Sequence, residues 1–216
     1  MLERMESFFS SRLDGYDEHM LRDIEGAAEF YPFTASLLPP DPGNRILDLG
    51  SGTGLELEFY YGLGGSASFT CIDMCGEMLQ VLSSKFPDKG IKTVCASYLD
   101  VPLGENRYDA AVSVESLHHF SEDVKLSLYR KLCASLKDGG EFILTDYFAP
   151  SREEEESMAD EYLRLRREQG IEDGVLCHYD TPFTVFHETA VLLEAGFSSV
   201  EMLRSWAATY TLRAVR

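Results

Sequence analysis

The chain has little positive charge. Its 216 residues contain 19 Lys and Arg against 37 Asp and Glu, which gives a formal net charge of -18. A strongly acidic surface repels phosphate backbones and anionic lipid headgroups. The densest basic stretch, Arg164 to Arg167, follows four consecutive glutamates, as expected for one helix whose charges complement the helix dipole. The composition therefore argues against nucleic-acid and membrane partners and favours a small-molecule substrate.

Long apolar runs and cysteine pairs are also missing. No run approaches the roughly 18 apolar residues of a membrane span, and the first residues lack the apolar segment of a signal peptide. We therefore expect a cytoplasmic protein. Five cysteines, an odd number, fit reduced and packed thiols better than a disulfide framework. Cys71 and Cys75 are four residues apart without a second pair, so we predict no metal site.

The pattern that is present is an alternation of short apolar runs and longer helical stretches. It begins after residue 44 and predicts a single α/β domain whose mostly parallel sheet is covered by helices on both faces. The expected strands are 45–49, 67–73, 91–96, 108–115, 140–148, 198–206 and 208–215, and the expected helices are 55–63, 76–86, 122–136, 152–169 and 185–195. The last two strands leave no room for a crossover helix, so they should form an antiparallel hairpin. Before residue 44 we expect a helical segment, 17–38, that ends at two prolines.

A glycine-rich turn follows the first of these strands, in the stretch RILDLGSGTG from Arg45 to Gly54. Glycine tolerates the dihedral angles of a tight turn and lets a ligand approach the backbone. The third glycine of a dinucleotide fingerprint would fall at Leu55, and Asp48 would oppose a pyrophosphate. A cofactor with a cationic end reverses that sign. The turn therefore favours S-adenosylmethionine, which carries a sulfonium and an ammonium and no phosphate.

A second carboxylate supports this interpretation. Asp73 ends the next strand, 19 residues after Gly54, where it can accept hydrogen bonds from ribose hydroxyls. Met74 can lie against an adenine ring, because a polarizable thioether packs well on an aromatic face. Asp73 alone could equally cap the helix that begins near Cys75.

These residues resemble the class I S-adenosylmethionine-dependent methyltransferases. The resemblance rests on four stretches in order, ILDLGSGTG, CIDMCGEML, VCASYLDVPL and YDAAVSVESLHHF, and covers roughly residues 44–147. It implies a Rossmann-like seven-stranded sheet in the order 3-2-1-4-5-7-6 with the last strand antiparallel. It also divides the chain into a helical cap (1–40), a cofactor-binding core (44–147), a helical or lid insertion (150–185) and a final helix and hairpin (186–216).

The resemblance also implies roles for individual residues. The backbone of Gly50, Ser51 and Gly52, in the turn closed by Gly54, would hold the methionine portion, with Asp48 towards its ammonium. The other cofactor-binding residues are Asp73 at the ribose, Met74 beside the adenine, Ser97 and Tyr98 at the adenine edge, Glu115 at the methionine end and Tyr16 as a cover. An aspartate normally stands where this chain has Ser97.

Methyl transfer from a sulfonium mainly needs aligned reactants, and a base only where the acceptor must lose a proton. His119 is our first candidate for that base, although one histidine of the pair with His118 could be packed and the other solvated. Further candidates at the rim are Asp146, Tyr147, His178, Tyr179 and Asp180. Two alternatives stay open, a domain that binds S-adenosylmethionine or its demethylated product without catalysis, and an NAD-dependent oxidoreductase. We expect a monomer or homodimer that methylates a small molecule.

Overall fold

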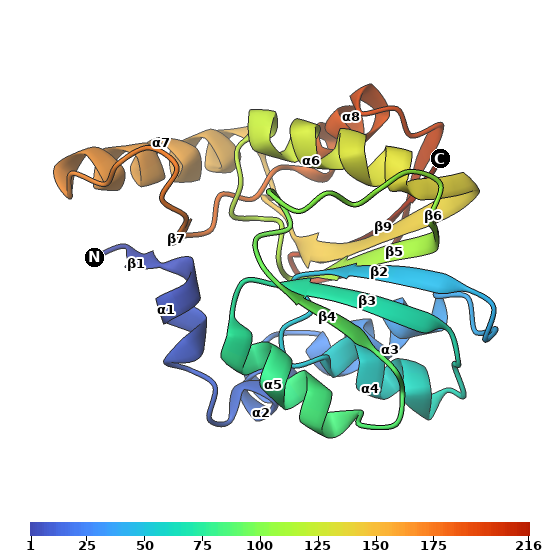
Figure 1. Ribbon diagram of the computed structural model, residues 1–216. Coiled ribbons are helices and arrows are strands. Elements are labelled where there is room, and N and C mark those ends of the chain that lie inside the picture. Colours follow the sequence, from blue (N-terminus) through green and yellow to red (C-terminus); the bar gives the residue numbers. More distant parts are fainter.

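A computed structural model describes all residues from 1 to 216, and a seven-stranded sheet forms its centre (Figure 1). From one edge to the other the strands are β4 (Lys92–Cys95), β3 (Ser68–Asp73), β2 (Arg45–Leu49), β5 (Tyr108–Val114), β6 (Leu136–Tyr147), β9 (Thr209–Val215) and β8 (Ser199–Trp206). Counted along the chain, these seven strands follow the order 3-2-1-4-5-7-6. Only β9 runs antiparallel to its neighbours. The predicted Rossmann-like fold is confirmed.

Helices cover both faces of the sheet (Figure 1). On one face lie α6 (Glu122–Ser135) and α8 (Val185–Glu194), and on the other lie α3 (Ala27–Ser36), α4 (Leu55–Gly62) and α5 (Gly76–Lys85). Successive strand residues point to opposite faces. Accordingly, Leu47 and Phe142 belong to the apolar cluster that includes α6 and α8, whereas Ile46 and Ile143 belong to the cluster that includes α3, α4 and α5. Burial on both faces explains the nearly continuous apolar character of the central strands.

The amino-terminal segment differs from the single helical stretch expected over 17–38. It forms α1 (Met5–Ser10) and α2 (Tyr16–Asp23) before α3 begins. The break falls at Gly26, which has a φ of 82° and precedes α3. A Cβ atom there would lie 2.4 Å from the Cβ of Trp206, so the close approach of the β8–β9 turn requires glycine.

A second, two-stranded sheet was not predicted. Here β1 (Glu3–Arg4) pairs antiparallel with β7 (Cys177–His178), next to the long helix α7 (Arg152–Glu168) that extends away from the sheet (Figure 1). The Ser151 hydroxyl accepts a hydrogen bond from the Glu154 amide and caps α7. The pairing of β1 with β7 brings the first residues of the chain beside a segment far along the sequence.

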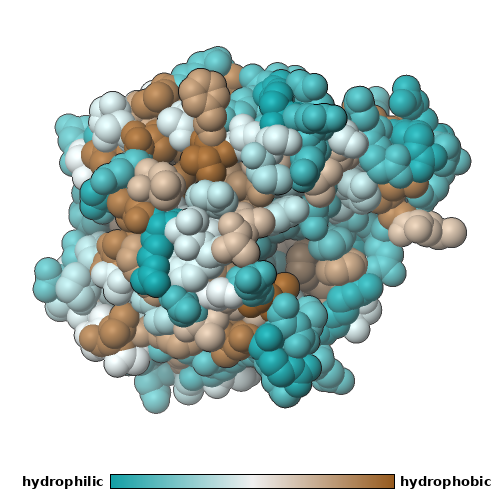
Figure 2. Space-filling model, turned by 180° about the vertical axis from the view of Figure 1, so that it is seen from behind, coloured by the Kyte–Doolittle hydropathy of each residue, from teal (hydrophilic) through white to brown (hydrophobic).

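The surface is mixed in polarity. Seen from behind, apolar residues are scattered among hydrophilic ones (Figure 2). No helix of the protein combines the length and the apolar character needed to cross a membrane.

Candidate functional site

The turn after β2 depends on its glycines. Gly50, Gly52 and Gly54 have positive φ angles of 76°, 50° and 75°. A Cβ atom at Gly50 would lie 2.1 Å from the Ser116 Oγ, and one at Gly54 would lie 3.0 Å from Leu82 of α5. A Cβ at Gly52 would meet nothing within 4 Å. The first and third glycines therefore allow close packing, whereas the second leaves open space beside the backbone.

A cavity lies against this turn, with an empty volume of about 750 Å³. We call it the glycine-turn cavity. Ten of the twelve predicted site residues line it: Tyr16, Gly50, Ser51, Gly52, Asp73, Met74, Ser97, Tyr98, Glu115 and His119. The fold thus brings these residues together, and their individual roles in binding stay predictions.

The other two predicted residues, Asp48 and Gly54, do not line the cavity. Asp48 is only 1% exposed and accepts a hydrogen bond from the Cys71 thiol. Burial, followed by the negative charge of the neighbouring Glu56, raises the pKa of Asp48 well above its ordinary value. Asp48 therefore lies behind the turn, beside Glu56, and does not face the cavity.

Of the two neighbouring acids, Asp48 and Glu56, only Glu56 reaches the cavity. It lies in the first turn of α4 and lines the glycine-turn cavity, and its Oε1 atom is buried without a hydrogen-bond partner. Burial raises the pKa of Glu56 to about 7, although its bond with Asp48 and the charge of Lys85 act in the opposite direction. A cationic group in the cavity would supply the missing partner of Oε1 and favour the ionised carboxylate.

Asp73 supports the glycine turn directly. Its Oδ2 accepts a hydrogen bond from the Gly52 amide, and its Oδ1 accepts one from the Cys75 amide, both at 2.8 Å. A carboxylate offers about four lone pairs, so each oxygen keeps one for a ligand hydroxyl. Asp73 therefore does bind the backbone before α5, as the sequence left possible, and its remaining lone pairs can still bind a ligand.

Ser97 and Tyr98 follow β4 at the same edge of the sheet. The Ser97 hydroxyl accepts a hydrogen bond from the Leu99 amide at 3.2 Å. The Tyr98 hydroxyl contacts the Oγ of Ser116 at 3.0 Å, which ties this loop to the one after β5. Both residues therefore have local structural partners as well as a surface on the cavity.

Helix α2 covers the cavity. Tyr16, at its first position, lines the glycine-turn cavity. The next residue, Asp17, accepts hydrogen bonds from the Thr53 hydroxyl in the glycine turn and from the Lys85 ammonium at the end of α5. Lys85 also pairs with Glu58 at 2.6 Å. These contacts fix the cover over the turn.

A second cavity adjoins the first. Its empty volume, part of it open to solvent, is about 1780 Å³, and we call it the outer cavity. Four residues line both cavities: Phe9, Tyr16, Glu115 and His119. Glu115 has a φ of 49°, a conformation that is uncommon outside glycine, and its carboxylate accepts a hydrogen bond from the Thr209 hydroxyl at 2.9 Å. The two cavities thus meet at a group of polar and aromatic side chains.

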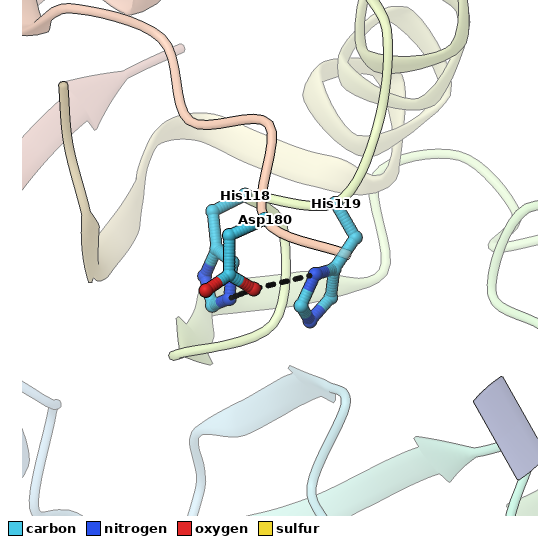
Figure 3. Close-up of side chains that lie close together, drawn as sticks. All are labelled: His118, His119 and Asp180. Atoms are coloured by element: carbon cyan, nitrogen blue, oxygen red, sulfur yellow. Dashed lines mark ion pairs between the residues drawn. The ribbon is translucent and has the colours of Figure 1, made fainter. Parts of the chain in front are cut away.

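Both histidines after β5 are buried, at 7% and 6% exposed, so neither is the solvated residue that the sequence left possible. The Nδ1 atom of His118 lies 2.5 Å from the Oδ1 of Asp146. The Nδ1 of His119 lies 3.1 Å from the Tyr179 carbonyl oxygen. Since a carbonyl only accepts, His119 donates from Nδ1 and keeps a lone pair on Nε2. Asp180 points between the two rings (Figure 3).

The two histidines carry different charges. Burial lowers the pKa of His118, but the charge and hydrogen bond of Asp146 outweigh it and raise that pKa to about 10. Burial, reinforced by the positive charge of His118, lowers the pKa of His119 to about 3. At neutral pH, His118 is therefore a cation paired with Asp146, and His119 is neutral.

The remaining rim candidates come from the end of β6, from β7 and from the loop after β7. The Thr181 amide donates to the His118 carbonyl oxygen at 2.8 Å, which places Asp180 beside the histidines. Tyr147 and His178 line the outer cavity with Asp180. Asp146 does not line it and acts on His118 from behind. The Tyr179 side chain stacks on a tyrosine of α7 and also stays outside the lining.

Ten of the 21 residues that line the glycine-turn cavity were predicted and eleven were not, and among these eleven are three that take part in the geometry described above. They are Glu56, Ser116 and Phe9. Glu56 could have been suspected, because a residue in the first helical turn after a glycine turn lies close to the ligand side. Ser116 and Phe9 gave no comparable signal, since their positions depend on contacts between segments distant in the sequence.

Comparisons with known proteins agree with this geometry. A family model described as a methyltransferase domain matches residues 46–140. The chain is 29% identical over 183 residues to the ubiquinone/menaquinone biosynthesis C-methyltransferase of Shewanella sediminis. This alignment covers 78% of this chain and 72% of that protein. The chain is also 32% identical over 126 residues to the tRNA (carboxymethyluridine(34)-5-O)-methyltransferase of Arabidopsis thaliana. That alignment covers 57% of this chain and 29% of the plant protein.

Among solved structures, human N-acetylserotonin methyltransferase in complex with SAM aligns with a TM-score of 0.68 and 15% identity. The alignment covers 98% of this chain and 56% of that one. At this identity the likeness concerns the fold alone. The chain spans only part of the length of the human and Arabidopsis proteins.

Proposed function

Since the chain belongs to the class I S-adenosylmethionine-dependent methyltransferases, we propose that it transfers a methyl group to a small molecule bound in the outer cavity. S-adenosylmethionine, the cofactor of this family, would occupy the glycine-turn cavity. The observation that carries the proposal is the direct junction of the two cavities at Phe9, Tyr16, Glu115 and His119. A junction of this kind lets donor and acceptor meet for an in-line displacement.

The residues of the glycine-turn cavity fit the cofactor. The free Oε1 of Glu56 suits the ammonium of the methionine portion, and the remaining lone pairs of Asp73 suit the ribose hydroxyls. When bound, the cofactor supplies an electrophilic methyl on a sulfonium that is a good leaving group. The protein's contribution is to orient the two reactants and exclude water, which can lower the barrier by several kcal/mol.

His119 is the residue that we propose as proton acceptor. Its Nδ1 proton is engaged by the Tyr179 carbonyl, and its Nε2 lone pair is available at the junction of the cavities. Because burial and the charge of His118 lower the pKa of His119 to about 3, this role applies to a phenol or thiol, whose proton becomes strongly acidic as the methyl bond forms, and not to an ammonium group.

A small acceptor suits the charge of the protein better than a nucleic acid does. One relative is named as a tRNA methyltransferase, yet a net charge of -18 opposes a polyanion. We also propose that residues 1–40 and 150–185 select the acceptor, since they supply Phe9, Tyr16 and Asp180 to the outer cavity. A cytoplasmic location and a monomeric or homodimeric state stay predictions.

The experiment is a screen for S-adenosylhomocysteine release with panels of phenols, thiols and amines, and with bulk tRNA as a separate arm. Turnover with a small molecule supports the proposal, and turnover with tRNA alone contradicts it. With an active acceptor in hand, His119→Gln should lower kcat by roughly 10²–10⁴-fold while the affinity for S-adenosylmethionine stays unchanged. His187→Gln, a histidine outside both cavities, controls for loss of stability.

A further inference from the structure

A cluster of three side chains that can ligate an ion lies at the outer cavity, and one of them, His119, also lines the glycine-turn cavity. His118, His119 and Asp180 each place one nitrogen or oxygen within 4.8 Å of the other two (Figure 3). We propose that these three residues bind a divalent transition-metal ion. The proposal goes beyond methyl transfer and does not depend on it.

Without the ion, Asp180 makes long ion-pair contacts with the two histidines, and the same distances suit a shared metal ion. The Oδ1 of Asp180 lies 3.5 Å from the Nε2 of His118 and 3.4 Å from the Nδ1 of His119. Both separations exceed the usual 2.7–3.2 Å of a hydrogen bond. Ligand atoms that each lie about 2.1 Å from a tetrahedral or octahedral metal are about 3.0–3.4 Å from one another. The Asp180 oxygen is therefore near the position that a metal ligand would take.

The neighbours of the cluster are those of a metal-binding histidine. The Nδ1 of His118 contacts the Asp146 carboxylate at 2.5 Å, so its Nε2 is the atom turned towards Asp180. Because His118 is a cation without the ion, metal binding would release its Nε2 proton to solvent. A carboxylate behind a ligating histidine fixes the ring and raises its basicity as a ligand. Glu115 adds a further carboxylate beside His118 and Asp146. Three carboxylates near two imidazoles give the cluster a net attraction for cations.

The donor set defines the chemical class of ion. Two imidazoles and one carboxylate suit zinc, iron(II), cobalt(II) and similar first-row ions, and leave positions for water or substrate. All three residues also line the outer cavity, so an ion held by them would face the acceptor.

Metal binding would change the role of His119. The Nδ1 atom that now donates to the Tyr179 carbonyl would instead face the ion, and the remaining ring proton would sit on Nε2. His119 would then be a ligand and not a proton acceptor.

The test uses the full-length protein, stripped of metal by chelation and titrated with Co²⁺ while its visible absorption is recorded. We expect saturable binding of one ion, displacement by Zn²⁺, and affinities at least tenfold lower in Asp180→Asn and His119→Gln. The Asp180 side chain is 43% exposed, which makes its conservative variant compatible with folding. Circular dichroism confirms the fold of each variant.

The matched control is Asp23→Asn, which alters another carboxylate beside a histidine, Asp23 with His19 at 2.9 Å, in the same cavity. Its affinity for Co²⁺ should equal that of the unaltered protein. The proposal fails if the metal-free protein shows no saturable binding. It also fails if both ligand variants bind as tightly as the control, or if intense near-ultraviolet bands assign the ion to a cysteine thiolate.

Discussion

Replacing Glu56 with glutamine should remove a pH dependence from cofactor binding. In the free protein the pKa of Glu56 is about 7, because the carboxyl is buried in the glycine-turn cavity. A donor with a sulfonium and an ammonium favours the ionised carboxylate and so lowers that pKa. Binding therefore releases a proton, and the affinity should rise as the pH rises towards the free-state pKa.

The magnitude follows from the fraction of protein that is already ionised. With a free-state pKa of about 7 and a much lower bound-state pKa, that fraction rises from roughly 0.1 at about pH 6 to roughly 0.9 at about pH 8. The apparent Kd for S-adenosylmethionine should thus fall about tenfold between these two conditions. The amide side chain of the Glu56→Gln variant is neutral throughout this range, so the tenfold change should be missing from that variant.

Isothermal titration calorimetry at both pH values measures the effect, and buffers of different ionisation enthalpy count the protons released. The amino group of the donor itself titrates near pH 8, and the variant records that background. If Glu56→Gln retains the full pH dependence of the unaltered protein, Glu56 is not the group that titrates on binding. Glu115→Gln serves as a comparison, because burial also raises the pKa of Glu115 to about 7.

The same carboxyl affects folding with the opposite dependence on pH. A carboxyl with a raised folded-state pKa stabilises the fold fully below its unfolded pKa, and this contribution is lost as the pH rises through the folded value. For Glu56, from 4.5 to about 7, the loss amounts to about 3 kcal/mol. Thermal unfolding without the donor should show a falling Tm over that interval, which Glu56→Gln should flatten.

Three further predictions concern packing and closure. Gly50 and Gly139 both have a positive φ, but only at Gly50 would an added Cβ collide with a neighbouring side chain. Gly50→Ala should therefore lower the free energy of unfolding, measured by chemical denaturation, by about 2 kcal/mol more than Gly139→Ala. Asp17→Asn should speed cofactor dissociation about tenfold in stopped-flow traces, because its two anchoring bonds weaken, whereas Asp14→Asn should not. Lys125→Met should cost about 3–5 kcal/mol in unfolding experiments, because it leaves a buried glutamate without its cation.

Most of the sheet was predictable because each strand is specified by residues within it and directly beside it in the sequence. Each central strand is a short apolar run bounded by turn residues, and the absence of a linker between the last two strands specifies a hairpin. The small sheet of β1 and β7 has no such signal, since two-residue strands show no periodicity. The break at Gly26 was equally hidden, because Trp206, whose packing requires it, is 180 residues away.

The site was predictable where one motif carries it. The glycine turn identified the cavity and most residues around it. The raised pKa of Asp48 was not predictable, because it depends on complete burial and on the charge of Glu56. The states of His118 and His119 depend in the same way on Asp146 and on a loop that crosses them from the far end of α7.

The two cavities are lined by different parts of the chain, which affects how the acceptor preference of such an enzyme can change. The walls of the glycine-turn cavity come largely from the ends of β2, β3 and β5, whereas much of the outer cavity comes from α1, α2, β7 and the β8–β9 turn. Substitutions in these outer segments can reshape the choice of acceptor and leave the donor cradle intact. A library randomised at Phe8, Arg12 and Ala207 is therefore a rational starting point for evolving new acceptor preferences.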